Sequence, residues 1–376
     1  MSVKYSIKMG FKTITFKSKL GGDLMLKEMS RRDFLKVSAA TGVALIAGEV
    51  LRRGGSVAYG SVQIPEIEKA TITIITDNYY DALRPDSKIA KRYRMKPRTS
   101  IYNMNLHAEH GLACCVETVV DGKSHSLMFD FGVDYQGVNK NMELLDIDFK
   151  MIEALALTHG HFDHWGALIA LLKSQREKVS KGIPLYVGEE AFSERFVQFP
   201  TGLQSLEFLN RENVESLGLV KIVETKEPFA IIPGAYFSGR IERVTEYEKV
   251  PPVFLVQRGD KKEHDVMIGE QALILNVKGK GLVVLSGCAH SGIVNAVKHA
   301  QKMTGIEKVH AVLGGFHLIG AKPEIIQRTV ADIKAINPDY IVPMHCTGFE
   351  AITAFGMEMP NQFIINTAGT RYLFTA

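Results

Sequence analysis

The stretch LTHGHFDHWG, residues 157–166, decides how the rest of this sequence is interpreted. It places four side chains that commonly bind metals within six residues, namely His159, His161, Asp163 and His164. The apolar run 154–158 leads into it and predicts a buried strand that ends at the first histidine. Since alternate side chains of a strand point the same way, we expect His159 and His161 to converge on one ion.

After the strand, the chain is expected to turn into a helix, residues 166–178, so that Asp163 and His164 face a second ion. Imidazole and carboxylate ligands favour Zn²⁺, with Mn²⁺ or Fe²⁺ as alternatives. In the alternative interpretation the histidines only cap a strand, but burying several imidazoles and a carboxylate without partners is costly. The sequence therefore predicts two divalent ions, an arrangement that can generate a hydroxide nucleophile at neutral pH.

The remaining pattern is that of an α/β protein. We expect strands at residues 71–76, 112–120, 124–129, 154–158, 272–277, 281–285, 309–313 and 340–343. We expect helices at residues 136–145, 166–178 and 323–336, and a further helix that begins at Gly292. Hairpins in both halves combined with strand–helix alternation favour two mixed sheets packed face to face with helices outside.

Residues 79–105 form a polar, basic stretch without periodicity. We interpret this stretch as a lid-like loop bordering the active site, with disorder as the alternative. Four tyrosines provide side chains to pack it, namely Tyr79, Tyr80, Tyr93 and Tyr102. Its basic side chains are Arg84, Lys88, Lys91, Arg92, Arg94, Lys96 and Arg98. Such a run is typical of a solvated face; the alternative is that one or two of them bind a substrate phosphate or carboxylate.

The first sixty residues are predicted to be an export leader and its flank rather than part of the catalytic domain, which we assign to residues 61–376. The segment SRRDFLK, residues 30–36, precedes a weakly apolar stretch, residues 37–48, as in twin-arginine leaders. That stretch is shorter than the roughly 20 residues that span a bilayer. We expect an extracytoplasmic or periplasmic protein that touches a membrane only through an uncleaved leader. An ordinary N-terminal helix, in a cytoplasmic protein, is the alternative.

Composition narrows the class of partner. A net charge of +4 is too mild to indicate nucleic-acid binding, and four cysteines are too few for a disulfide framework. We expect a small-molecule substrate, possibly an anionic one, and no nucleic acid. The sequence carries no signal for an oligomeric state.

The HxHxDH pattern of residues 159–164 resembles the signature of the metallo-β-lactamase superfamily, and the resemblance covers roughly residues 71–376. It implies an αββα sandwich with the site between its halves. It also implies that His159 and His161 hold one ion and that Asp163 and His164 hold the other. Asp163 would additionally orient the nucleophile.

Two further ligands of the superfamily pattern are replaced here. Cys288, in the segment SGCAHSG, stands where a bridging aspartate is expected, and it either bridges as a thiolate, contacts substrate or only packs. No histidine occurs between His164 and His264, so His290 is the expected replacement for the usual middle ligand. His345 fits as the remaining ligand of the second ion. The missing aspartate weakens the case for the second ion relative to the first.

Several other motifs together resemble one branch of the superfamily, the group named after 7,8-dihydropterin-6-methyl-4-(β-D-ribofuranosyl)-aminobenzene-5′-phosphate synthase and described as dihydropteroate-synthase-like. They are Asp77-Asn78, Glu109-His110-Gly111, Ser286-Gly287-Cys288-Ala289-His290, Gly314-Gly315-Phe316-His317 and His345-Cys346-Thr347-Gly348. Asn78 and His110 are candidate substrate contacts. His317 is a candidate for proton transfer, metal or substrate binding, with a structural role as the alternative. We assign the remaining histidines, His125, His264, His299 and His310, to surface or core.

Three functions follow from these residues. The first is a metal-dependent hydrolase that uses a metal-activated hydroxide on a phosphate ester, ester or amide bond. The second, implied by the branch resemblance, is transfer of a dihydropterin-methyl group to an aryl amine. The third is a non-catalytic protein with a closed metal site.

Overall fold

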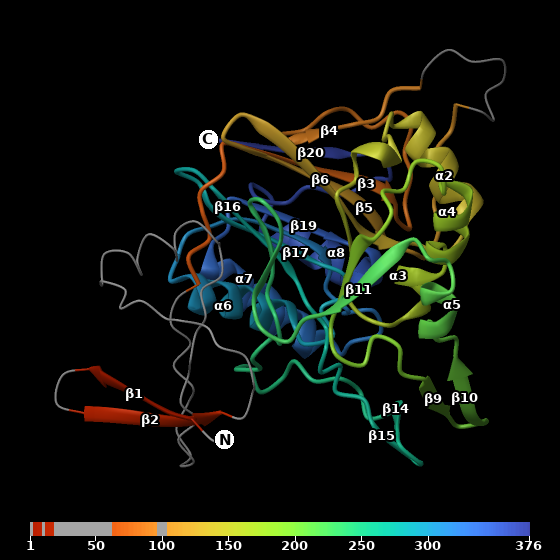
Figure 1. Ribbon diagram of the computed structural model, residues 1–376. Coiled ribbons are helices and arrows are strands. Elements are labelled where there is room, and N and C mark those ends of the chain that lie inside the picture. The colour runs from red at the N-terminus through yellow and green to blue at the C-terminus, as the bar shows by residue number, and fades with distance from the viewer. Residues whose placement is uncertain (1–2, 10–11, 19–61, 96–103) are drawn as a thin grey trace. The chain divides into compact units, whose positions relative to one another are not determined.

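The computed structural model describes residues 3–9, 12–18, 62–95 and 104–376 (Figure 1). By its internal contacts the chain divides into two units, Met1–Val57 and Ala58–Ala376. In the first unit, β1 (Val3–Met9) and β2 (Lys12–Ser18) pair as an antiparallel hairpin. The predicted leader motif at residues 30–48 and the predicted boundary at residue 60 lie outside the described residues, so both stay predictions on structural grounds.

The second unit contains an eight-stranded mixed sheet with the order β11-β8-β7-β6-β5-β3-β20-β4. Its strands are β3 (Lys69–Thr76), β4 (Ala90–Lys91), β5 (Ala113–Val120), β6 (Lys123–Phe131), β7 (Ala154–Leu157), β8 (Ile183–Val187), β11 (Val220–Glu224) and β20 (Arg371–Thr375). The pairs β6–β7, β7–β8 and β8–β11 are parallel, and the rest are antiparallel.

A six-stranded mixed sheet has the order β12-β13-β16-β17-β18-β19. Its strands are β12 (Phe229–Ile232), β13 (Ala235–Phe237), β16 (Leu273–Val277), β17 (Gly281–Ser286), β18 (Val309–Gly315) and β19 (Tyr340–Met344). One buried apolar cluster includes Ile72 and Phe129 from the larger sheet and Leu275 and Leu313 from the smaller one. The two sheets therefore pack face to face, because each turns an apolar face inward.

Helices cover the outer faces of both sheets (Figure 1). On the larger sheet lie α2 (Tyr135–Leu144), α3 (Phe162–Trp165), α4 (Leu168–Ser174) and α5 (Arg211–Glu215). On the smaller sheet lie α6 (Ile293–Thr304), α7 (Pro323–Ile336) and α8 (Phe349–Glu358). Two 3₁₀ turns complete the described helical elements, η2 (Phe149–Met151) and η3 (His345–Thr347). The predicted αββα sandwich is confirmed.

The expected elements agree with the described ones at most positions, with one clear difference. The helix expected at residues 166–178 is shorter, since only α4 lies in this range, and a separate short helix, α3, precedes it with Gly166 between the two. The chain passes close to the end of β6 here, since a Cβ on Gly166 would lie 3.0 Å from the Val133 Cα. The close approach explains why a small residue stands at the break.

A four-stranded antiparallel sheet, order β10-β9-β14-β15, was not expected from the sequence. Its strands are β9 (Arg195–Phe199), β10 (Gly202–Leu206), β14 (Phe254–Arg258) and β15 (Lys261–His264). A buried ion pair between Arg195 Nε and Asp265 Oδ2, at 2.8 Å, joins the start of β9 to the residue after β15. The sheet positions Phe254, whose ring centroid lies 6.1 Å from that of His161.

The first part of the predicted lid-like loop packs against the body. β4 pairs with β20, and Tyr80 and Tyr93 contact a small cluster with Leu106 and Leu144. Residues 96–103, which include Tyr102, Lys96 and Arg98, lie outside the described residues, and the lid assignment stays a prediction.

The described basic side chains of this loop bind within the chain. Arg92 donates to the Thr370 hydroxyl (2.7 Å) and the Ile365 carbonyl (2.9 Å). Lys88 donates to two carbonyls, Lys91 and Arg94 pair with Asp86, and Arg84 pairs with Asp81. These contacts favour a structural role for the described part of the basic run over binding of a substrate anion.

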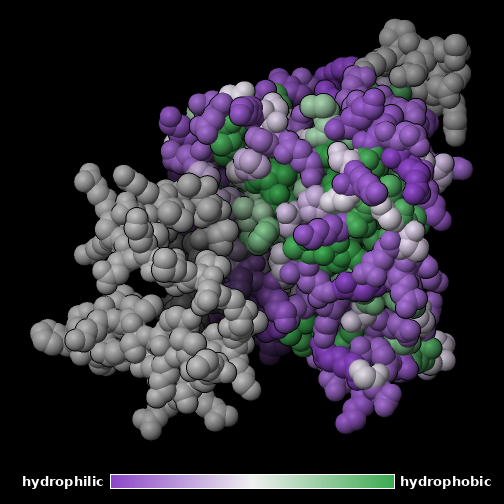
Figure 2. Space-filling model, in the orientation of Figure 1, coloured by the Kyte–Doolittle hydropathy of each residue, from purple (hydrophilic) through white to green (hydrophobic). Residues whose placement is uncertain are grey.

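The face shown in Figure 2 is mainly hydrophilic, with separate hydrophobic areas between hydrophilic ones. Across the described residues, no helix combines the length and the apolar character that a membrane span requires.

Candidate metal centre

Four strand ends supply the candidate site. β7 leads into His159 and His161, β17 into Cys288 and His290, β18 into His317, and β19 into His345. β17, β18 and β19 run parallel, so their carboxyl ends meet at one edge of the smaller sheet. This topology explains how side chains nearly 200 residues apart share one site.

The backbone adopts the left-handed conformation near the end of β6 and shortly after β17, β18 and β19. Asp130, Ala289, His317 and His345 have φ values of 56°, 57°, 45° and 53°. Non-glycine residues rarely adopt this left-handed conformation, which costs about 1–3 kcal/mol each and is concentrated at functional sites. The turns aim the adjacent imidazole and thiol side chains into the interior.

The first donor group consists of His159, His161 and His290, whose ligand nitrogens lie within 4.8 Å of one another. All three side chains are buried. The Nε2 atoms of His159 and His161 and both ring nitrogens of His290 have no hydrogen-bond partner within the described part of the chain. Buried nitrogens without partners are unfavourable unless another group binds them.

Burial lowers the pKa of all three imidazoles, and the neighbouring positive groups lower it further. For His161 the pKa falls to about 3, with Arg195 the largest contribution after burial. The three rings are therefore neutral at pH 7, which is the form that binds a metal ion.

The second donor group consists of Asp163, His164, Cys288 and His345, again with ligand atoms within 4.8 Å. The Asp163 Oδ2 atom lies 3.2 Å from His345 Nε2 and 3.8 Å from His164 Nε2. The His164 Nε2 atom lies 3.1 Å from Cys288 Sγ. Although burial opposes ionisation, the surrounding imidazoles hold the pKa of Asp163 well below its usual range.

Asp130 is a residue of this site that sequence reasoning missed. Its Oδ2 atom lies 2.6 Å from His164 Nδ1 and also accepts from the Thr158 hydroxyl at 2.8 Å. That hydroxyl lies 3.0 Å from His159 Nδ1, so one carboxylate supports a histidine of each donor group. Burial lowers the pKa of His164, but Asp130 and Asp163 outweigh it and raise the value to about 9.

A carboxylate that accepts the Nδ1–H bond of a histidine leaves the Nε2 atom of the same ring free to bind a metal. Many metal-binding histidines have such a carboxylate partner. The sequence carries a signal for Asp130, an acidic residue between Phe129 and Phe131 in an otherwise apolar strand end. Buried, unpaired carboxylates are rare, so such a residue points to a partner.

Asp77 and Asn78 surround His345. The Asn78 side chain donates to the His345 carbonyl at 2.8 Å. The Asp77 carboxylate is buried; Oδ2 accepts from the Asn366 amide at 2.7 Å, and Oδ1 lies 3.8 Å from His345 Nδ1, too far for a hydrogen bond. Burial raises the pKa of Asp77, and His345 opposes that rise.

The structure places His317 and His110 at opposite sides of the cluster. The His317 ring lies 3.9 Å from the His290 ring, and its ligand atom groups with those of Cys288 and His290. His110 stacks on His345 at 5.1 Å, with Nε2 3.7 Å from the Asp163 carboxylate, and its side chain is 59% exposed. His317 therefore lies inside the site and His110 at its rim.

The histidines assigned to surface or core have structural partners. His125 and His310 pair with carboxylates of Glu153 and Asp339, while His264 and His299 contact backbone carbonyls. These four rings lie outside the donor groups found among the described residues.

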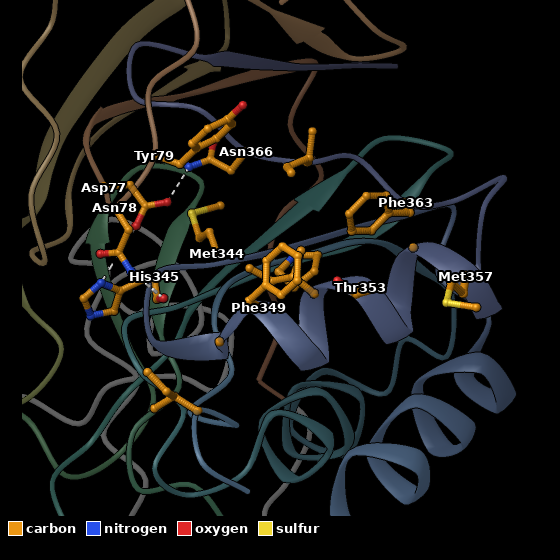
Figure 3. A pocket seen from close by; sticks show the side chains of 16 residues that line it. Asp77, Asn78, Tyr79, Met344, His345, Phe349, Thr353, Met357, Phe363 and Asn366 are labelled. Carbon is orange, nitrogen blue, oxygen red and sulfur yellow. Dashed lines mark hydrogen bonds and ion pairs between the residues drawn. The ribbon is translucent and has the colours of Figure 1, made fainter. Parts of the chain in front are cut away.

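The two donor groups fit divalent metal ions. The unpartnered imidazole nitrogens of the first group and the carboxylate, imidazole and thiol of the second form the donor set that transition metals prefer. Beside the second group lies a cavity of about 660 Å³. Figure 3 shows Asp77, Asn78 and His345 at one end of it and Phe363, Thr353 and Met357 at the other.

Comparisons with known proteins agree with this fold and site. Residues 118–234 match the Metallo-beta-lactamase superfamily, and residues 28–48 match the TAT (twin-arginine translocation) pathway signal sequence. The predicted resemblance to a twin-arginine leader is thus confirmed. The crystal structure of Tm1679, a metal-dependent hydrolase of the beta-lactamase superfamily, superimposes with a TM-score of 0.62 at 22% identity, covering 80% of this chain and 98% of that one.

Two relatives come from Methanocaldococcus jannaschii. One is the 7,8-dihydropterin-6-methyl-4-(beta-D-ribofuranosyl)-aminobenzene-5'-phosphate synthase, 32% identical over 277 residues, which are 73% of this chain and 92% of the relative. The other is an uncharacterized protein, 28% identical over 264 residues, which are 70% of this chain and 92% of the relative. The chain therefore belongs to the metallo-β-lactamase superfamily and, within it, to the family of that synthase.

Proposed function

We propose that the chain is a metal-dependent hydrolase of a phosphate ester, ester or amide bond. The observation that supports it most is the first donor group, three buried neutral imidazoles with unpartnered nitrogens, directly beside the carboxylate-containing second group. Two divalent ions bound there, Zn²⁺ being the expected metal, would polarise the scissile bond and activate water at neutral pH.

The chain's own residues would position the reactants. We assign His159, His161 and His290 to one ion and Asp163, His164 and His345 to the other. Asp163, in α3, belongs to the second donor group and is suited to orient the attacking water. His317, whose Nδ1 atom has no partner within the described residues, is suited to donate a proton to the leaving group.

The test is metal content together with hydrolysis of bis(p-nitrophenyl) phosphate. His161→Ala should lower the rate by more than the roughly 10–100-fold typical of residues that only support a ligand. His125→Ala is the matched control, because His125 pairs with Glu153 away from the site, and it should keep the rate. A metal-free protein that is fully active, or an equally active His161→Ala variant, would refute the proposal.

The 32% identical synthase favours a second candidate, transfer of a dihydropterin-methyl group to an aryl amine. The bound metals would then stabilise a departing diphosphate. The test is product formation from 6-hydroxymethyl-7,8-dihydropterin diphosphate and 4-aminobenzoate, followed by mass spectrometry. No coupled product, combined with no thermal shift from any pterin, would remove this candidate.

The twin-arginine match favours an extracytoplasmic destination. Replacing Arg31 and Arg32 by Lys should retain the protein in the cytoplasm of a host with this export route. The same change at Arg52 and Arg53, an arginine pair outside the matched stretch, should leave export intact. Export of both variants alike would contradict the assignment.

A further inference from the structure

Two pockets of similar size flank the donor groups. The apolar pocket, of about 660 Å³, touches His345 of the second group and extends along α8 to Phe349 and Met357. The lysine pocket, of about 700 Å³, touches His290 and His317 and opens at Lys249 and Lys322.

The apolar pocket suits an uncharged, flat group. Phe349, Met357 and Ile319 line it and are 79%, 75% and 59% exposed, so a bound ring would remove a large apolar area from water. Among the described residues no lysine or arginine lines it. At its inner end, the buried Asp77 Oδ1 atom has no hydrogen-bond partner in the described chain and can accept an N–H bond from a ligand.

The lysine pocket has the opposite character. Lys249 and Lys322 are exposed, and neither forms an ion pair within the described part of the chain. Among the described residues, the one carboxylate that lines the pocket belongs to Glu248, and it already accepts the backbone N–H groups of Val294 and Asn295 at 2.9 Å. The uncompensated charge at the pocket mouth is therefore positive.

Ile319 forms a wall of both pockets, so they meet beside the donor groups. Its backbone N–H donates to the Cys346 carbonyl at 3.3 Å, which joins the loop after β18 to η3. A molecule in either pocket would direct its inner end toward the same set of histidines, one from the His345 side and one from the His290 side.

We propose that the two pockets bind two organic groups at the same time, a flat uncharged ring with N–H donors in the apolar pocket and an anionic molecule or group in the lysine pocket. The inference rests on the proposed function, because it places both reacting ends at the metal ligands. In hydrolysis the two groups are the two sides of the scissile bond, and in transfer they are donor and acceptor.

Simultaneous binding is tested by calorimetric titration of the zinc-loaded protein with two probes. 6-Hydroxymethylpterin represents the flat ring, and sulfanilate represents the anion, since a sulfonate is a poor zinc ligand. We expect each probe to bind in the presence of saturating amounts of the other, with a Kd changed by less than about threefold. Mutual exclusion, or no binding of either probe, would overturn the inference.

Two variants with matched controls assign each probe to its pocket. Phe349→Ser should weaken pterin binding about tenfold and leave sulfanilate binding unchanged, whereas Phe199→Ser, at an exposed phenylalanine of β9, should affect neither. Lys322→Glu should weaken sulfanilate alone, whereas Lys308→Glu, at an exposed lysine outside the pocket lining, should not. Equal effects of both pocket variants on both probes would contradict two separate pockets.

The binding measurements need no turnover, so they separate this inference from the proposed function. Loss of metal-dependent hydrolysis with both probes still bound would refute the hydrolase and keep the two pockets. Metal-dependent hydrolysis by a protein in which the two probes exclude each other would support the hydrolase and refute the two pockets.

Discussion

The two donor groups lie side by side but differ in how they are satisfied without an ion. The first group, His159, His161 and His290, consists of neutral imidazoles whose ligand nitrogens have no partners within the described chain. In the second group, both ring nitrogens of His345 also lack a hydrogen-bond partner within the described residues, but the Asp163 carboxylate faces His345 and Asp130 pairs with His164, so charges are partly balanced within the protein. Only an ion satisfies the first group, whereas protons and internal contacts partly satisfy the second.

The largest effect is expected from His290→Ala. It removes one of three ligands from the group with the fewest internal contacts, so we expect loss of one metal equivalent and a rate reduced by at least about a thousandfold. His264→Ala, at an exposed histidine, is the control. Elemental analysis and rate measurements on the same samples check the prediction, and two ions retained in His290→Ala would contradict the comparison.

Asp130→Asn should have the next largest effect. The amide keeps the shape of the side chain but removes the charge that supports His164 and, through Thr158, His159. We expect metal affinity or rate to fall about 10–100-fold. Asp134→Asn changes only an exposed helix cap and should alter neither. Competition with a chromophoric chelator measures the affinity, and an unchanged value in Asp130→Asn would remove Asp130 from the site.

The first group also predicts a pH dependence of the metal-free protein. An unfolded histidine binds its proton near pH 6.5 but folded His161 only near pH 3, so stability falls as the pH drops between these values. The pKa of His164 is raised, to about 9, so its contribution is already complete below pH 6.5 and does not oppose this fall. Between pH 7 and 5, His161 alone lowers the free energy of unfolding by about 2 kcal/mol. Chemical denaturation of His161→Asn should show a correspondingly smaller fall, and an identical fall would contradict the assignment.

Cys288→Ser is expected to have the smallest effect on the rate, about tenfold or less, because three other ligands of the second group remain. The cobalt-loaded protein should lose its thiolate-to-cobalt absorption band in this variant. Cys346→Ser is the control, since the Cys346 thiol donates to the Cys288 carbonyl rather than joining a donor group. A band that survives Cys288→Ser would show that Cys288 only packs.

The ligand-rich loop and the sandwich could be predicted from the sequence because their signals, a short motif and the apolar runs of single strands, are local. The HxHxDH motif follows a buried strand, and the expected strands have clear apolar runs, so these elements were predictable, whereas β8, β11, β12, β13 and β20 of the two sheets were not expected. The sheet of β9, β10, β14 and β15 was not, since its exposed strands β10 and β15 carry no alternating apolar pattern.

The sequence signals that Asp130 has a partner but does not identify that partner, because the contact is tertiary. Asp130 meets His164 and Thr158, the latter 28 residues later in the chain, because β6 pairs in parallel with β7. The left-handed turns at His317 and His345 could not be predicted either, since histidine is only enriched in this conformation and most histidines do not adopt it.

Anomalous diffraction at the zinc edge, from crystals of the zinc-loaded protein, tests the central claim most directly. The account predicts two peaks per chain, one among His159, His161 and His290 and one among Asp163, His164, Cys288 and His345. A peak in the second group alone, or in neither group, would contradict it.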